Sequence, residues 1–280
     1  MTVSIGRYAH RITALLAALC LGGFGSALSA QTARSTLLVV PWLLDAAHER
    51  PAPDGEARWQ FIVTPYVWAS GLKGTVGVRD RTAEVNVTFK KLLEHLEGAF
   101  MLPVEARRGR WGIALEVVYV KLEDRSATPG PLFSAARLTA SQGIFEGGPR
   151  LRVLDTNAVA VDLLAGARWW KLSNTLTLSP GMLPGIELNL DKGWIDPLAG
   201  ARVFITLSPR LKVQARGDVG GFGVSSDFSW QALGALVYQL NTRFTLRAGY
   251  RRIDVDYDDD TGFIYDVRIR GPIVGVSISF

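Results

Sequence analysis

The sequence predicts an all-β protein: a closed, antiparallel, membrane-spanning β-barrel of about ten strands, with eight or twelve strands as the alternatives. Apolar residues make up 48% of the chain and the mean hydropathy is +0.16. Even so, after residue 30 no apolar run reaches the roughly 18 residues that a membrane helix needs. Instead, apolar and polar positions alternate along many segments, and short and long connections follow one another. A membrane barrel distributes its apolar residues in this way.

Residues 1–30 are predicted to be a secretory signal peptide. Arg7 and Arg11 are followed by the apolar run ITALLAALCLGGFGSAL and the small residues SALSA. A basic start, a short apolar stretch and small residues are typical of a leader that is removed from the mature protein. Cleavage is expected after Ala30, with Ala27 as the alternative.

The mature chain is expected to have no disulfide and no thiolate metal site, because the only cysteine, Cys20, lies in the leader. Without the two arginines of the leader, the formal net charge falls from +5 to +3. A nearly balanced, exported protein has no nucleic-acid partner. Residues 31–57 are expected to form a periplasmic N-terminal segment and linker, since RPAPDGEA is rich in Pro and Gly. The barrel is expected to span 58–280.

Strict alternation carries the strand predictions from residue 59 onward. In 110–123, for example, Trp111, Ile113 and Leu115 share one face, whereas Gly112 and Ala114 share the other. Such runs match the roughly 9–11 residues of a tilted membrane strand. The segment 71–95 is the weakest place, because it can hold an extra hairpin, and KKLLEHLE resembles a helical turn. Ten strands are expected near 59–70, 96–107, 110–123, 134–150, 157–173, 191–206, 209–220, 227–240, 243–257 and 262–280.

The connections alternate in length. RGR, SPR and NTR are tight, whereas the segments 71–95, 124–133 and 174–190 are long. Outer-membrane barrels have short periplasmic turns and longer external loops. The last strand ends on the short-turn side, so Phe280 is expected at the periplasmic interface.

The polar faces of the strands combine charged side chains with glycine and alanine, which suits a narrow lumen crossed by ion pairs. Aromatic residues near the strand ends are typical of the interfacial girdles of a membrane barrel. The residues predicted to line the lumen are Arg168, Arg202, Arg216, Arg247, Arg251, Arg268, Arg270, Glu116, Asp162, Asp196, Asp218, Asp254 and Asp256.

The apolar face slips by one residue in each of the last two strands. It runs from Phe244 to Tyr250 and resumes at Ile253; in the last strand it resumes at Val274 after Ile269. A one-residue slip flips every later side chain unless a bulge absorbs it. Paired irregularities are therefore predicted near 251–253 and 270–273, where Gly271 precedes a proline.

No catalytic, cofactor-binding or metal-ligating residues are predicted, and the protein is not expected to be an enzyme. The mature chain has only His48 and His95, and neither GxSxG nor HExxH occurs. DVDYDDDTG resembles the start of a calcium loop but has Asp259 in place of the required Gly and Tyr265 in place of the final Glu. A solvated loop with lumenal salt bridges is favoured there, and a divalent-cation site is the alternative.

The terminal GVSISF resembles the last strand of Gram-negative outer-membrane proteins. WQFIVTPYVWASGLKGTVGV, GDVGGFGVSSDFSWQ and RAGYRR resemble a poorly characterised group of small outer-membrane barrels, similar in general plan to OmpA- and OmpW-type barrels. The resemblance covers about 58–280. It implies location in the cell outer membrane, contact with outer-membrane lipids and lipopolysaccharide, and recognition of Phe280 by the barrel-assembly machinery. It implies no activity.

The function predicted from these features is that of an integral outer-membrane protein, either structural or a narrow passive conduit for small solutes. A plugged lumen and an open lumen both fit the sequence. The alternatives are a lipid-modifying enzyme at the external rim, in which His95 would be the base, and a loop-mediated binding or adhesion barrel.

Overall fold

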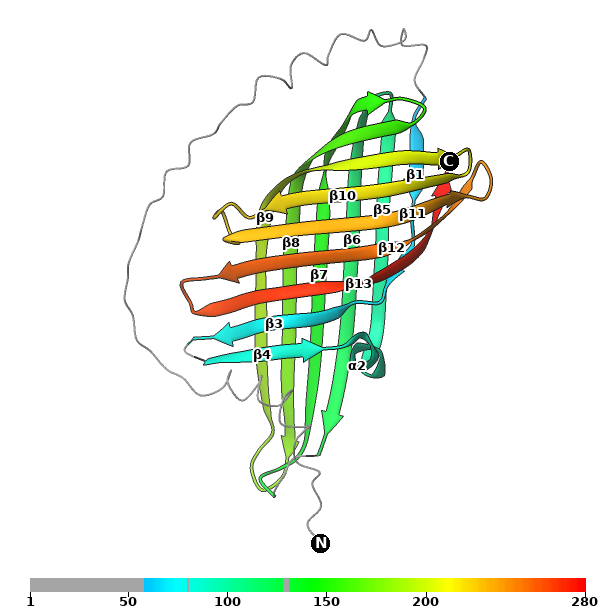
Figure 1. Cartoon of the computed structure of the whole chain (residues 1–280). Helices are drawn as coiled ribbons and strands as arrows, with labels where there is room; N and C mark the ends of the chain where they lie inside the picture. The colour runs from blue at the N-terminus through cyan, green and yellow to red at the C-terminus, as the bar shows by residue number, and fades with distance from the viewer. Residues whose placement is uncertain (1–57, 80, 128–130) are drawn as a thin grey trace.

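The computed structural model describes residues 58–79, 81–127 and 131–280, which form a closed ring of ten antiparallel strand positions (Figure 1). The predicted leader and the segment 31–57 lie outside the described residues. The ring confirms the predicted ten-stranded barrel, because its last strand pairs with its first. In ring order the strands are β1 (Gln60–Val63), β5 (Leu96–Arg108), β6 (Trp111–Ser126), β7 (Phe133–Asp155), β8 (Val159–Pro180), β9 (Ile186–Ser208), β10 (Leu211–Gly220), β11 (Phe228–Gln239), β12 (Phe244–Asp258) and β13 (Phe263–Ser279).

The first ring position is divided among three strands. β1, β2 (Tyr66–Trp68) and β3 (Gly71–Val78) pair in succession with β13. The segment 71–95 holds both features that its sequence suggests, because β4 (Arg81–Val87) forms a hairpin with β3 and α2 (Phe89–Glu94) follows. β4 has no ladder with β5, so the hairpin does not enlarge the ring.

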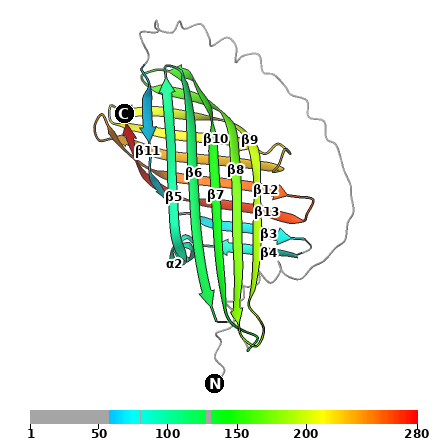
Figure 2. The ribbon, with the colours of Figure 1, turned by 180° about the vertical axis from the view of Figure 1, so that it is seen from behind.

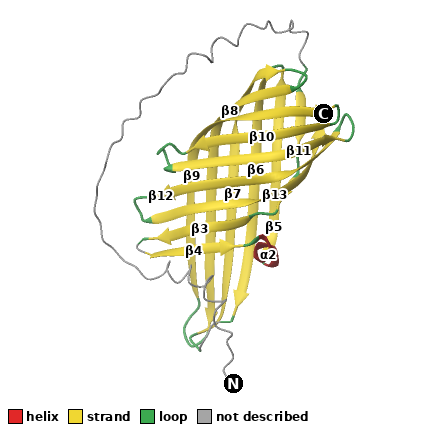
Figure 3. Ribbon diagram, viewed as in Figure 1, coloured by secondary structure: helices red, strands yellow, loops and turns green. Residues whose placement is uncertain are grey.

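The strands β7, β8 and β9 are longer than expected and run the height of the molecule (Figure 2). β8 and β9 absorb most of the expected external loop at 174–190 and leave only 181–185 between them (Figure 3). The expected loop at 124–133 is shortened less, because β6 extends only to Ser126. The opposite end holds the tight turns at 109–110 and 209–210 together with Phe280. No helix within the described ranges is long and apolar enough to cross a membrane.

The predicted bulges in the last two strands are wrong. β12 and β13 pair without a register shift from Phe244–Ile278 to Asp258–Ile264. On β12 the outward face changes from Tyr250 to the half-exposed Arg252, while the inward face continues into the buried Ile253. The strand therefore keeps its register. Its apolar residues face outward up to Tyr250 and inward from Ile253 onward.

The same inversion occurs on β8. Leu163 and Trp169 face outward and are more than 40% exposed, whereas Trp170 and Leu172 are buried inside and Lys171 faces outward. A lipid-facing wall needs apolar residues outside, whereas a wall in water needs them inside. The inversion therefore marks where each strand passes from lipid into water.

Two rings of outward aromatic residues bound the lipid-facing surface. From Trp111 to Tyr119, β6 has the length of a tilted membrane strand, roughly 9–11 residues. We call the part of the barrel beyond the outer belt the external extension. The outer belt comprises Phe100, Tyr119, Phe145, Trp169 and Tyr250, and the inner belt comprises Trp59, Phe61, Trp111, Tyr238, Phe244 and Phe280.

Candidate functional site: the filled lumen

The lipid-spanning part of the barrel contains a network of buried charges, which we call the charged layer. The Glu146 carboxylate on β7 accepts hydrogen bonds from Arg216 on β10 and from Arg168 on β8, whose Nη2 lies 2.8 Å from Glu146 Oε2. Arg168 Nη2 also lies 2.6 Å from Asp218 Oδ1, and Arg168 is 0% exposed. Charges removed from water need partners of opposite sign, and these four side chains supply them to one another.

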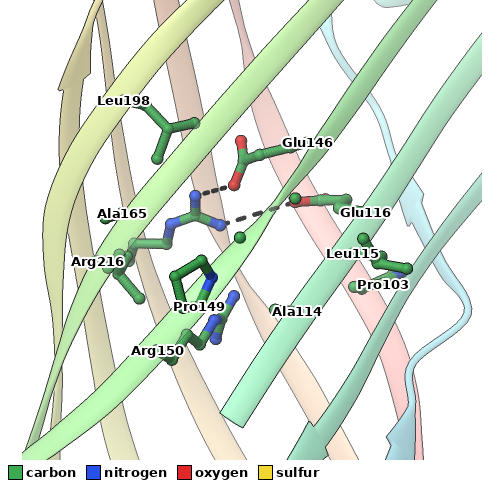
Figure 4. Close-up of a pocket in the computed structure, with 13 residues that line it drawn as sticks. Pro103, Ala114, Leu115, Glu116, Glu146, Pro149, Arg150, Ala165, Leu198 and Arg216 are labelled. Atoms are coloured by element: carbon green, nitrogen blue, oxygen red, sulfur yellow. Dashed lines mark hydrogen bonds and ion pairs between the residues drawn. The ribbon is translucent and has the colours of Figure 1, made fainter. Parts of the chain in front are cut away.

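The charged layer crosses the lumen to the opposite wall. Arg216 lies between Glu146 and Glu116, with its Nη1 3.7 Å from Glu116 Oε2 (Figure 4). Glu116 also accepts hydrogen bonds from Arg251 and from the Tyr66 hydroxyl, the latter at 2.6 Å. These contacts connect β6, β7, β10, β12 and β2 through the interior.

A second group of charges lies nearer the short-turn end. Arg202 Nη1 and Nη2 each lie 2.9 Å from one oxygen of Glu105, and Nη2 also lies 2.6 Å from Asp162 Oδ2. Arg150 and Arg152 complete the group through Glu105 and Asp162, respectively. The predicted lumen set omitted Glu105, Glu146, Arg150 and Arg152. Their even spacing along the strands could have identified them as lumenal, since Glu146, Arg150 and Arg152 share one face of β7.

The external extension has an aromatic core, which we call the aromatic layer. Trp194 stacks on Tyr257 with ring centroids 4.1 Å apart and on Trp170 at 5.7 Å. Phe263 and Tyr265 pack beside them and are almost fully buried. The aromatic layer thus occupies the interior of the extension as a soluble protein's core would.

Asp196 links the aromatic layer to the connection between β10 and β11. Its carboxylate, 0% exposed, accepts hydrogen bonds from Trp170 Nε1 at 3.1 Å and from Ser226 Oγ at 2.7 Å. Ser226 follows the turn after β10, so this carboxylate fastens the connection between β10 and β11 to the interior. A buried carboxylate with several hydrogen-bond donors is well compensated.

The thirteen residues predicted to line the lumen divide into two sets. Arg168, Arg202, Arg216, Arg247, Arg251, Glu116, Asp162, Asp196 and Asp218 lie inside the barrel. Arg268, Arg270, Asp254 and Asp256 instead lie on the outward face of the external extension. Asp254 pairs with Arg268 at 2.9 Å, but outside the lumen. The prediction that these four residues line the lumen is wrong, because at their level the outward face of the wall meets water and can carry charged side chains.

Two cavities lie among these side chains. One cavity of about 100 Å³ is lined by residues that include Arg247, Gln214 and Leu233, and a second of about 30 Å³ lies beside Glu116 and Arg216 (Figure 4). Spaces of this size hold a few water molecules. Arg247 donates hydrogen bonds to Ser277 Oγ and Gln214 Oε1.

The described residues contain few candidates for catalysis or metal binding. His95 Nδ1 lies 3.6 Å from Asp124 Oδ1 at the external end, and both side chains are about one-third exposed. Nucleophilic catalysis needs a nucleophile within hydrogen-bond reach of the base, and no hydroxyl in 58–79, 81–127 or 131–280 is hydrogen-bonded to His95. No group of three or more His, Cys, Asp or Glu residues in these ranges could hold a metal ion.

The acidic segment between β12 and β13 is organised by an ion pair. Lys192 Nζ lies 2.7 Å from Asp259 Oδ2 and 2.9 Å from Thr261 Oγ1. Burial opposes the ionisation of Asp259, but hydrogen bonds from Lys192, Thr261 and the Phe263 amide outweigh it and lower the pKa of this carboxyl. The carboxylate thus holds the turn closed.

Comparison with known proteins finds similarity in structure alone. No family model and no curated protein sequence matches the chain. The outer membrane protease OmpT from Escherichia coli superposes with a TM-score of 0.52 at 10% identity, covering 80% of this chain and 98% of OmpT. The translocator domain of the autotransporter NalP from Neisseria meningitidis has a TM-score of 0.39 at 11% identity and covers 79% and 88%. The Pseudomonas putida toluene transporter TodX has a TM-score of 0.31 at 14% identity and covers 81% and 89%.

The ring closure, the two aromatic belts and the OmpT superposition agree with one another. A closed ring with an apolar outward band satisfies every requirement of a lipid-spanning sheet. This chain therefore has the fold of a Gram-negative outer-membrane β-barrel and belongs in the outer membrane.

Proposed function

We propose that this protein is a closed, non-conducting outer-membrane barrel that anchors its external extension at the cell surface. The filling of the lumen carries the proposal: the charged layer crosses the lipid-spanning part, and the aromatic layer fills the extension. A small barrel filled by its own side chains leaves no aqueous path. Of the two roles that the sequence leaves open, this packing favours the structural one over the conduit.

The lengths of the connections indicate which end of the barrel faces the periplasm. Phe280 and the tight turns at 109–110 and 209–210 share one end, which is the periplasmic end in outer-membrane barrels. Phe280 is 74% exposed there, which leaves its ring accessible to the barrel-assembly machinery. Deletion of Phe280 is expected to lower the amount of protein recovered in the outer membrane. Unchanged recovery would remove this partner from the proposal.

Conductance tests the closed lumen. Purified, refolded protein in planar lipid bilayers is expected to give no single-channel steps under conditions in which a porin conducts. Steady steps whose ion selectivity changes in Arg216→Gln would show instead that the protein is a conduit.

A hydrolase acting at the external rim is the second candidate, and the His95–Asp124 pair is the observation that favours it. The likeness to OmpT concerns the fold alone and transfers no activity. Wild-type protein and His95→Ala would be incubated with labelled phospholipid, labelled lipopolysaccharide and a fluorogenic peptide mixture. Turnover that disappears in His95→Ala would establish this candidate, whereas equal background in both proteins would eliminate it.

A further inference from the structure

Four basic side chains lie together on the outward face of the external extension, and we call them the basic patch. On β12, Tyr250 belongs to the outer belt and Arg252 is the next outward residue. On β13, Pro272 faces lipid and Arg270 is the adjacent outward residue. The patch therefore lies at the level where lipid headgroups meet water. Its members are Lys73, Arg252, Arg268 and Arg270.

Like charges face one another across the strands of the basic patch. Arg252 lies directly opposite Arg270, and Lys73 lies directly opposite Arg268. Like charges at directly opposed positions destabilise a sheet. Asp254 pairs with Arg252 at 2.7 Å and with Arg268 at 2.9 Å, and neither Arg270 nor Lys73 makes an ion pair with any described residue. One carboxylate thus pairs with only two of the four cations.

The next outward positions, farther from the membrane, carry the opposite charge. Asp256 lies directly opposite Asp266. Burial and the neighbouring carboxylates of Asp266, Asp227 and Asp258 raise the pKa of Asp256. An anion is therefore attracted to the membrane-proximal row and repelled from the distal row.

We propose that the basic patch binds the phosphate groups of an outer-leaflet lipid, namely the phosphorylated lipid A anchor of lipopolysaccharide. Guanidinium groups bind phosphate oxygens through paired, charge-assisted hydrogen bonds. Arg252 is held in place by Asp254 and by the Trp230 ring, whose centroid lies 4.7 Å from its guanidinium carbon. The inference rests on the orientation given with the proposed function, which places the outer belt at the outer leaflet.

The test is a lipid titration of the refolded full chain in detergent micelles, with bound lipid counted by native mass spectrometry. The probes are lipid A and the same lipid stripped of its phosphates. Each basic residue near a lipid surface strengthens binding about fivefold, so Arg252→Gln/Arg270→Gln is expected to weaken lipid A binding roughly 30-fold. Binding of the phosphate-free lipid should be weak in both proteins.

The chain offers a matched control in Arg125 and Arg137. These arginines also lie directly opposite each other, on β6 and β7, and share one carboxylate, Glu123. They lie farther beyond the outer belt, since Lys121 and Glu123 separate Arg125 from Tyr119 on the outward face of β6. Arg125→Gln/Arg137→Gln removes the same charge and is expected to leave lipid A binding unchanged.

Equal affinities for lipid A in the two double variants would overturn the proposal, as would equal binding of lipid A and its phosphate-free form by the wild type. Thermal unfolding identifies a variant that has lost its fold, and single Arg252→Gln and Arg270→Gln variants then provide the comparison. Conductance tests the closed lumen separately: a conducting wild type would refute the proposed function while leaving the lipid result intact.

Discussion

Glu146 offers the sharpest test of the charged layer, because its carboxylate accepts hydrogen bonds from two buried arginines. Glu146→Gln keeps the size of the side chain but removes the charge that compensates Arg168 and Arg216. Arg168 is 0% exposed and its Nη1 already lacks a hydrogen-bond partner among the described residues, of which Asp218 alone would remain as its anion. Removing one partner of a buried ion pair costs about 3–5 kcal/mol. We expect the free energy of unfolding to fall by that amount.

The control is Glu97→Gln, which breaks the exposed ion pair between Glu97 and Lys121 at 3.0 Å. Solvent screens an exposed ion pair, so this variant should resemble the wild type. Urea unfolding of vesicle-inserted protein, followed by tryptophan fluorescence, measures both variants. If Glu146→Gln lies within about 1 kcal/mol of Glu97→Gln, the charged layer is either solvated or unimportant for stability, and the reasoning fails.

Three further predictions concern the wall and the extension. Gly249→Ala would place a Cβ 2.2 Å from the Gly234 carbonyl oxygen and should destabilise the barrel by about 1–3 kcal/mol, whereas Gly234→Ala meets open space and should be neutral in the same urea assay. In vesicle-inserted protein, a membrane-impermeant maleimide should label Asp256→Cys, which faces water, but not Ala248→Cys, which faces lipid. Equal labelling would refute the boundary between lipid and water assigned on β12. The lowered pKa of Asp259 stabilises its turn above the ordinary carboxyl range, and this stabilisation is lost as pH falls through the folded-state value. The protection factors of the turn's amides, which compare their exchange with that of an unstructured chain at the same pH, should therefore fall at low pH, and Asp259→Asn should abolish that dependence.

The sequence was most informative about strands and ring closure. Alternation located every position of the ring, since each strand presents two faces with a period of two residues. It also identified the two ambiguous elements in 71–95 as a hairpin and a helical turn, which became β3–β4 and α2. The sequence-based prediction underestimated the lengths of β8 and β9. Beyond the outer belt, their apolar residues point inward, and the polar residues between them read as a loop in the sequence.

The lumen was only partly predictable. Arg168 and Asp218 could be assigned because each lies on the polar face of a strand whose other face is apolar. Glu105 could not be assigned as the partner of Arg202, because the two are 97 residues apart and meet only when the ring closes. Arg270 was predicted to face the lumen but faces outward. In the sequence, the polar face of a strand looks the same whether it lines a lumen or meets water.

By itself, the sequence determined that the chain forms alternating strands and that those strands need a closed ring. Only the tertiary structure decided which face is inside along each half of a strand. The physical reason is that alternation shows that the two faces of a strand meet different environments, but not which face meets the lumen, lipid or water. On β12 the outward medium changes from lipid to water between Tyr250 and Arg252, so an uninterrupted register carries apolar residues from the outside of the wall to its core.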